Sequence, residues 1–377
     1  MGNLKVGSSR IDITPPVGTP LEGYIESRGV SPGVHDKLFA KAFVLHDGKT
    51  DKVAVVSLDL VGVGRWLVEF ARKEIDSRTD IAGHNVMIAA THTHSGPRGV
   101  VDFFAGEQAF SQGFFDRHLS EKIGNAVADA VADANGKLHE AKIGFGRATA
   151  IGTCSNRRFP DGPFDPELGV IRLDSFGKER QIGCIINYSC HPTVLGPNNL
   201  LISADYPAYA CDTVQASLNK TREQEIVVSF LTGACGNVST RFTRKDSTFG
   251  EAERIGRALG TQVLKVLRGT KNTRKDITIS TAKQVIELSQ RKLPPLDSVR
   301  SNLKSGGELL RTLKARGASE GEIRVVESMT EGAKGLLAAY DYASKFEGRK
   351  FEVEIQIFRL GDTATLCAVP VELFVEL

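Results

Sequence analysis

Two histidines separated by one residue, His92 and His94, are the first side chains whose type and spacing could do chemistry. They follow residues 85–90, an apolar run that predicts a buried strand. Because residues i and i+2 of an extended backbone point to the same side, the two imidazoles are expected to converge. Gly96 and Pro97 predict a turn at the edge of the sheet, where open α/β sheets bind ligands. In a chain with 8 histidines, this pair favours a metal-binding or general-base role over a structural one.

A third histidine, His191, also follows an apolar stretch, at residues 182–188, and Pro192 ends the strand ladder behind it. A glycine-rich segment at residues 232–239 follows a further apolar run, at 226–231. Its small residues would let backbone amides approach a ligand, as in an oxyanion hole. A tight turn from strand to helix is the simpler alternative. Together, several strand ends with polar or glycine-rich sequence indicate one shared site.

A carboxylate near the end of the chain, Glu372, follows an expected strand at 363–369. Because Pro370 is favoured at the first position of a helix, we expect a short amphipathic helix at 371–377. Two imidazoles and one carboxylate are the donor set of hydrolytic zinc sites, with one position open for water. A first-turn glutamate that interacts with the helix dipole is the alternative from spacing alone.

Cys235 offers a competing nucleophile, because it lies in a turn flanked by small residues and His94 could act as its base. This alternative leaves His191 and Glu372 without a role. The 6 cysteines form no CxxC pair, which predicts reduced thiols in a reducing compartment.

Alternating strands and amphipathic helices must position these residues. Residues 52–60, 66–75 and 85–90 predict a βαβ unit with a parallel strand pair. Further strands are expected at 142–145, 170–173, 182–188, 226–231, 351–359 and 363–369, and further helices at 114–134, 207–218 and 251–267. Asp59 and Asp205 fall near strand ends, where each either fixes an imidazole tautomer or caps a turn. The expected fold is α/β, a layered sandwich of a mixed, largely parallel sheet flanked by helices.

A highly charged stretch at residues 294–346 has helical periodicity and is broken by Gly306, Gly307 and Gly317. We expect a helical insertion there, as a lid or a solvated capping layer, within one domain that covers residues 1–377. As an interaction surface, it would also suit a non-catalytic binding protein on the same scaffold.

The composition excludes several classes of protein. Hydrophobic residues make up 41% and charged residues 25%, as in globular proteins. The net charge of +3 is too small for a nucleic-acid partner, and no apolar run approaches the ~20 residues that span a bilayer. Residues 1–7 lack the apolar region of a signal peptide, so a cytoplasmic location is expected.

Five motifs resemble those of the neutral/alkaline ceramidase family and occur in the same order. They are THTHSGP at 91–97, CHPT at 190–193, SADYP at 203–207, TGACGNVS at 232–239 and VPVE at 369–372. GVHD at 33–36 and DPELGV at 165–170 also match, and the similarity runs from about Arg10 to the last residue. The chain is most similar to ceramidase-like catalytic domains that lack a C-terminal immunoglobulin-like domain.

The resemblance implies a zinc-dependent amidohydrolase that cleaves an N-acyl amide by attack of a metal-bound water. It implies that His92, His191 and Glu372 bind Zn²⁺. The family's fourth ligand is a tyrosine some tens of residues after this glutamate. Because the sequence stops at Leu377, we expect a truncated chain or a segment supplied by another chain.

The resemblance also assigns residues around the metal. It implies that His94 contacts the reacting group, that Arg157 faces the substrate and that Ser239 is catalytic, with residues 232–239 donating to the oxyanion. The family's GDVSPN reads GNVSTR at 236–241, which weakens the carry-over for Ser239. Because Arg241 stands where the family has asparagine, we expect a substrate more polar or anionic than ceramide.

Overall fold

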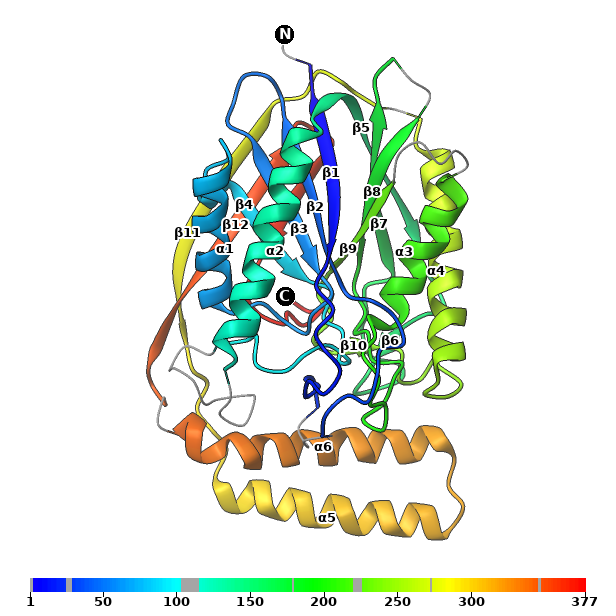
Figure 1. The fold of residues 1–377 in the computed structure, drawn as a ribbon. Helices are drawn as coiled ribbons and strands as arrows, with labels where there is room; N and C mark the ends of the chain where they lie inside the picture. Colours follow the sequence, from blue (N-terminus) through cyan, green and yellow to red (C-terminus); the bar gives the residue numbers. More distant parts are fainter. Residues whose placement is uncertain are drawn as a thin grey trace.

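The computed structural model describes residues 3–24, 29–102, 115–177, 180–219, 226–271, 273–344 and 347–377. Eight strands form the main sheet, in the order β4-β3-β2-β1-β5-β7-β8-β9 (Figure 1). Their bounds are β1 Lys5–Asp12, β2 Phe39–His46, β3 Val53–Leu58, β4 Val86–Ala90, β5 His139–Thr149, β7 Glu167–Ser175, β8 Gln181–Tyr188 and β9 Val227–Thr232. A short pair, β6 Ser155–Asn156 and β10 Val238–Ser239, lies beside the main sheet. The α/β class and the mixed sheet predicted from the sequence are therefore confirmed.

Parallel pairing does not predominate in this sheet, in contrast to the expectation. Among the described strands, β3–β4 and β8–β9 pair in parallel. The five other neighbouring pairs are antiparallel. The predicted βαβ unit is present as β3, α1 (Arg65–Arg78) and β4. The apolar runs in the sequence could not indicate strand direction, because strands that are buried on both faces have similar sequences in parallel and antiparallel pairs.

Helices cover one face of the main sheet (Figure 1). On the other face, the apolar side chains of the two halves of the main sheet pack together, and a second sheet packs against the same cluster. The helices are α1, α2 (Arg117–Gly136), α3 (Asp205–Leu218) and α4 (Phe249–Gly269). Residue 114, where the helix before Asn135 was expected to begin, lies outside the described residues. The second sheet comprises β11 (Ile279–Ser289), β12 (Lys350–Leu360) and β13 (Ala364–Ala368). A sheet flanked by helices was expected, and the second sheet adds a β layer to it: the alternating apolar side of β12, with Phe358 and Leu360 fully buried, packs into the core.

The two ends of the strand order approach each other, and this brings the loops of the site together. The halves of the main sheet are joined through a short β1–β5 pairing, while β9 packs beside β2, β3 and β4. Ser57 Oγ on β3 donates to Phe230 O on β9 at 2.6 Å. Thr232 Oγ1 donates to Thr91 O at 2.7 Å. The residues that follow β4 and β9 are therefore neighbours.

A helical hairpin lies across the end of the molecule to which this loop region points (Figure 1). It consists of α5 (Leu296–Ala315) and α6 (Glu320–Ala343) and is inserted between the paired strands β11 and β12. This confirms the predicted helical insertion at 294–346, of which residues 345–346 are not described. Among the described residues, no helix is both long and apolar enough to cross a membrane.

Candidate active site

His92 lies on the turn that follows β4. The amides of Thr91 and His92 donate to Leu58 O and Leu60 O, both at 2.8 Å, so the pairing with β3 continues past the end of the strand. The φ angle of His92 is then +68°, in the left-handed region that is unfavourable for a residue with a side chain. Its Nδ1 donates to Val61 O, which turns Nε2 into the site.

His94 meets His92 as predicted, with 3.3 Å between the two Nε2 atoms. The reason differs from the prediction, because the left-handed turn at His92, and not strand alternation, brings the two rings together. A Cβ on Gly23 would lie 2.6–2.8 Å from His94, so only glycine allows this loop to approach the ring. The ring of Tyr24 meets that of His94 edge-on, with 5.2 Å between ring centroids.

His191 follows β8 and is almost completely buried. Its amide donates to Val238 O at 3.0 Å, and its Nδ1 donates to Cys235 O at 2.6 Å. Its Nε2 then lies 2.9 Å from that of His92. Burial, and after it the nearby His92, lowers the pKa of His191 to about 4, so this imidazole is neutral at pH 7.

Glu372 lies next to both His92 and His191. Its Oε1 lies 3.5 Å from His92 Nε2 and its Oε2 lies 3.3 Å from His191 Nε2. Burial opposes ionisation, but the hydrogen bond with His191 and the charges of both histidines and Arg157 lower the pKa of Glu372 to about 2. The carboxylate is therefore ionised at neutral pH.

The predicted helix at 371–377 is wrong, because this segment crosses the loop after β9 without regular structure and ends in a turn. Gly236 N donates to Leu373 O at 2.7 Å, and Val375 N donates to Asn237 Oδ1 at 3.0 Å. A Cβ on Gly236 would lie 2.7 Å from Glu372 O, so glycine is what lets the segment lie here. These contacts, and not a helix, position the carboxylate.

The donor set fits a bound divalent metal. Because Nδ1 of His92 and of His191 each donates to a carbonyl, Nε2 is the ring atom of each histidine that is left to bind a metal. The two Nε2 atoms lie 2.9 Å apart, so one ion could contact both. The separations of 2.9–3.5 Å to Glu372 and within the histidines are close to the ~3.3 Å expected between tetrahedral ligands of zinc. The ligand atoms of His92, His94 and His191 all lie within 4.8 Å of one another.

Arg157 contacts the loop that positions Glu372. Its amide donates to Asn237 O at 2.7 Å and its Nη2 donates to Gly236 O at 2.6 Å. Ser239, the third expected catalytic residue, is buried, and its strand bridges to His191. The Oγ of Ser239 accepts from the amide of Arg241 at 3.2 Å.

The glycine-rich segment at 232–239 does not form the expected oxyanion hole with three of its amides. Those of Gly233, Gly236 and Val238 donate to Tyr188 O, Leu373 O and Cys235 O. The segment instead supplies the carbonyl that orients His191 and the groove that holds the chain around Glu372.

The alternative nucleophile, Cys235, is in an unsuitable environment. Its side chain is buried, and burial, followed by the charge of Glu372, raises the pKa of its thiol to about 12. A nucleophilic cysteine needs the opposite shift. Asp59 and Asp205 orient neither imidazole through Nδ1: Asp59 pairs with Lys41 at 3.3 Å, and Asp205 accepts from the amide of Leu195 at 2.9 Å.

Three features of the site had no signal in the sequence. The carbonyls of Val61 and Cys235 orient the two buried histidines, and backbone groups carry no side-chain pattern. Tyr24 reaches the site from an early loop. Arg244 donates through Nη1 to Thr193 O, two residues after His191.

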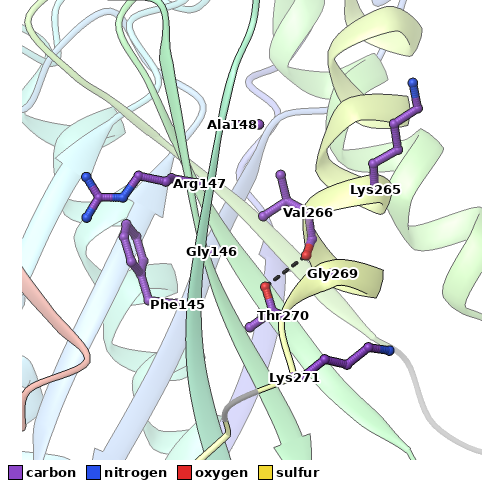
Figure 2. A pocket seen from close by; sticks show the side chains of 9 residues that line it. All are labelled: Phe145, Gly146, Arg147, Ala148, Lys265, Val266, Gly269, Thr270 and Lys271. Carbon is purple, nitrogen blue, oxygen red and sulfur yellow. Dashed lines mark hydrogen bonds between the residues drawn. The ribbon is translucent and has the colours of Figure 1, made fainter.

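A separate cavity of about 440 Å³ lies between β5 and α4 (Figure 2). Its lining is Phe145, Gly146, Arg147, Ala148, Lys265, Val266, Gly269, Thr270 and Lys271. No imidazole, thiol or carboxylate belongs to this lining, so the candidate chemistry lies at the histidine group.

The fold and the site together define an α/β protein with a candidate metal centre at the ends of its two parallel strand pairs. A family model described as neutral/alkaline non-lysosomal ceramidase, N-terminal, matches residues 4–252. Since this is more than half of the chain, the protein belongs to the neutral/alkaline ceramidase family, and the predicted resemblance is confirmed.

The curated relatives share low sequence identity with this chain and are longer than it. The chain is 28% identical over 253 residues to the neutral ceramidase of Drosophila pseudoobscura pseudoobscura, a match that covers 62% of this chain and 36% of the relative. It is 26% identical over 279 residues to the neutral ceramidase of Pseudomonas aeruginosa, covering 67% of this chain and 40% of the relative. The chain thus spans well under two thirds of the length of these relatives.

Solved structures show the same fold. The crystal structure of neutral ceramidase from Pseudomonas aeruginosa superposes with a TM-score of 0.67 at 19% identity, covering 96% of this chain and 61% of that one. A structure titled as a ceramidase complexed with C2 gives a TM-score of 0.66 at 20% identity, covering 76% of this chain and 47% of that one.

Proposed function

We propose that this protein is a zinc-dependent hydrolase that cleaves an N-acyl amide bond. One observation carries the proposal: two imidazoles fixed through Nδ1 by backbone carbonyls turn their Nε2 atoms toward each other and toward the ionised Glu372. This is the His₂-carboxylate set of hydrolytic zinc sites. Membership of the ceramidase family supports the amide as the bond that is cleaved.

The residues of the site have different roles in the proposed reaction. His92, His191 and Glu372 hold the metal, which when bound lowers the pKa of water to about 7 and polarises a carbonyl. His94, with its Nε2 3.3 Å from that of His92, can pass a proton to the leaving amine. Arg157 is fixed by Gly236 O beside the carboxylate, where it can orient a polar part of the substrate.

The experiment that tests this proposal compares His94→Ala with His92→Ala. In the first variant, metal content measured by mass spectrometry should stay near one equivalent, while kcat on an N-acyl amide falls by ~10²–10⁴, as for a lost general acid–base group. In the second variant, metal and turnover should be lost together, because a ligand is removed.

A cysteine mechanism gives the reverse pattern. Cys235→Ser would then abolish turnover, iodoacetamide would inactivate and a chelator would do nothing. We expect Cys235→Ser to change kcat little, because its thiol is buried and protonated. Full activity in protein shown to be metal-free would refute the proposal.

A further inference from the structure

Three arginines, Arg157, Arg241 and Arg244, gather between the histidine group and helix α6; we refer to them as the arginine cluster. Arg157 follows β6, and the other two follow β10, the strand paired with β6. From α6, Arg324 Nη1 donates to Arg241 O at 2.7 Å and to Arg244 O at 3.4 Å. The hairpin therefore fixes the backbone on which two members of the cluster stand.

The positive charges of the cluster are only partly compensated. Arg157 and Arg244 donate to Gly236 O and Thr193 O, which satisfy N–H groups but carry no charge. Arg241 pairs with Glu331 at 3.1 Å, but this carboxylate is 59% exposed, and such pairs are weak. Glu372 acts on Arg157 but also faces His92 and His191.

Two further observations show that these charges are close together and incompletely bonded. Burial, and in addition the charge of Arg241, lowers the pKa of both Arg157 and Arg244. Within the described part of the chain, the buried Nε of Arg244 has no acceptor. Partly buried guanidinium groups with mutual repulsion and an unused donor favour an anion among them.

The cluster also borders the point where the substrate would react. Arg157 Nη2 donates to Gly236 O at 2.6 Å, and the amide of Gly236 donates to the carbonyl of the residue after Glu372 at 2.7 Å. Arg244 contacts Thr193 O, and Tyr24, whose ring meets that of His94 edge-on, donates to Leu195 O in the same loop at 2.5 Å. An anion held by the cluster would therefore lie a few atoms from the reacting carbonyl.

We infer that the arginine cluster binds an acidic group, a carboxylate or a phosphate, placed next to the scissile amide, and that the substrates are anionic N-acyl amides. The inference rests on the proposed function. Planar guanidinium groups match both kinds of oxyanion through paired N–H donors. Arg241 and Arg244 are then the specificity-determining residues.

The kinetic test uses metal-loaded full-length protein and three substrates with the same acyl chain: N-dodecanoylglycine, N-dodecanoylphosphoethanolamine and the neutral N-dodecanoylethanolamine. We expect at least one acidic substrate to exceed the neutral one in kcat/KM by tenfold or more, consistent with a hydrogen bond to a charged group worth ~1.5–3 kcal/mol. The acid preferred identifies the group.

The variants separate binding of the acid from a structural role. Arg241→Asn and Arg244→Gln should each raise KM for the acidic substrate about tenfold or more, with kcat/KM for the neutral substrate nearly unchanged. Arg241→Lys, which keeps the charge, should recover part of the loss. Lys245→Gln removes an exposed charge from the same turn and is the matched control, with no expected change.

A binding measurement makes the inference independent of turnover. Calorimetry on metal-loaded His94→Ala protein should give tighter binding of N-dodecanoylglycine or its phosphate counterpart than of the neutral ethanolamide. Equal affinities, or variants that weaken acidic and neutral ligands alike, would overturn the inference and leave the proposed function standing. Tight acidic binding without turnover of any N-acyl amide by wild-type protein would support the arginine cluster and refute the proposed function.

Discussion

The proposed metal ligands at the strand ends, His92 and His191, and the proposed ligand Glu372 are held in different ways. His92 and His191 are each fixed twice, through the backbone amide and through Nδ1, by atoms of neighbouring strands or the turns that follow them. Glu372 lies on a segment without regular structure, and its side chain is 53% exposed. The histidine half of the site is thus part of the sheet, whereas the carboxylate half is attached to it through a few loop contacts.

This difference shows where tolerance to change should lie. A ligand whose orientation depends on the core cannot be replaced by water or by a neighbour without leaving buried polar groups unpaired. A half-exposed ligand on a surface segment can be lost more gradually. Three predictions test the contrast.

The largest effect should follow the loss of the buried ligand. His191→Ala removes one of two facing Nε2 donors and leaves Cys235 O without its partner. We expect metal content to fall close to zero and kcat/KM to fall by more than ~10³, since the water is no longer activated. Metal analysis and steady-state kinetics check this, with His139→Ala, a partly exposed histidine bonded to Lys137 O, as the control. Retention of one equivalent of metal by His191→Ala would contradict the expected difference between the histidines and Glu372.

A smaller effect should follow from disturbing the attachment of the carboxylate. In Gly236→Ala the new Cβ would lie 2.6 Å from the Phe374 ring and 2.7 Å from Glu372 O, so the segment must move. We expect weaker metal binding, by about the 10–100-fold typical of lost supporting contacts, with the fold intact. Competition with a chelator measures it. Gly250→Ala, whose Cβ would meet only Thr248 Oγ1 at 3.8 Å, is the matched control and should bind metal normally.

The third effect concerns stability, at a carboxylate whose pKa is shifted in the opposite direction to that of Glu372. Burial raises the pKa of Asp205 to about 6, with Asp36 adding to the shift, although the amides of Leu195 and Tyr206 oppose it. Between pH 4 and 6 the folded protein therefore binds more protons here than the unfolded chain, so the free energy of unfolding should fall as pH rises. The fall is roughly 3 kcal/mol for a shift of about two pKa units.

Denaturation by urea between pH 4 and 7 checks this dependence. In Asp205→Asn, this fall of roughly 3 kcal/mol in the free energy of unfolding should be absent, while the other carboxylates titrate as before. An unchanged slope in the variant would contradict the assignment.

The sequence was sufficient to find the histidines, because apolar runs mark strand ends and His92 and His191 follow two of them. It could not show how they are oriented, since a carbonyl such as Val61 O has no side-chain pattern. Nor could it reveal the left-handed turn at His92, which depends on pairing with the end of β3. The segment around Glu372 was mistaken for a helix because its apolar spacing reflects packing on the loop at Gly236.

The direction in which neighbouring strands pair was the second feature that the sequence did not reveal. Antiparallel pairing across most of the main sheet results from which apolar runs become neighbours, and this is a property of the whole fold. The helical insertion was predictable, because its charge and periodicity are local. Its contacts with Arg241 and Arg244 were not, since they join residues far apart in the chain.

The insertion point of the α5–α6 hairpin has a consequence for how this family can diversify. Ser289 and Lys350 face each other in the β11–β12 ladder, so the chain leaves and re-enters the sheet at one place. A descendant lineage, or a protein engineer, can lengthen, shorten or exchange the hairpin as a cassette without shifting the register of either strand. The surface beside the candidate site can then change while the strands that position His92 and His191 stay in place.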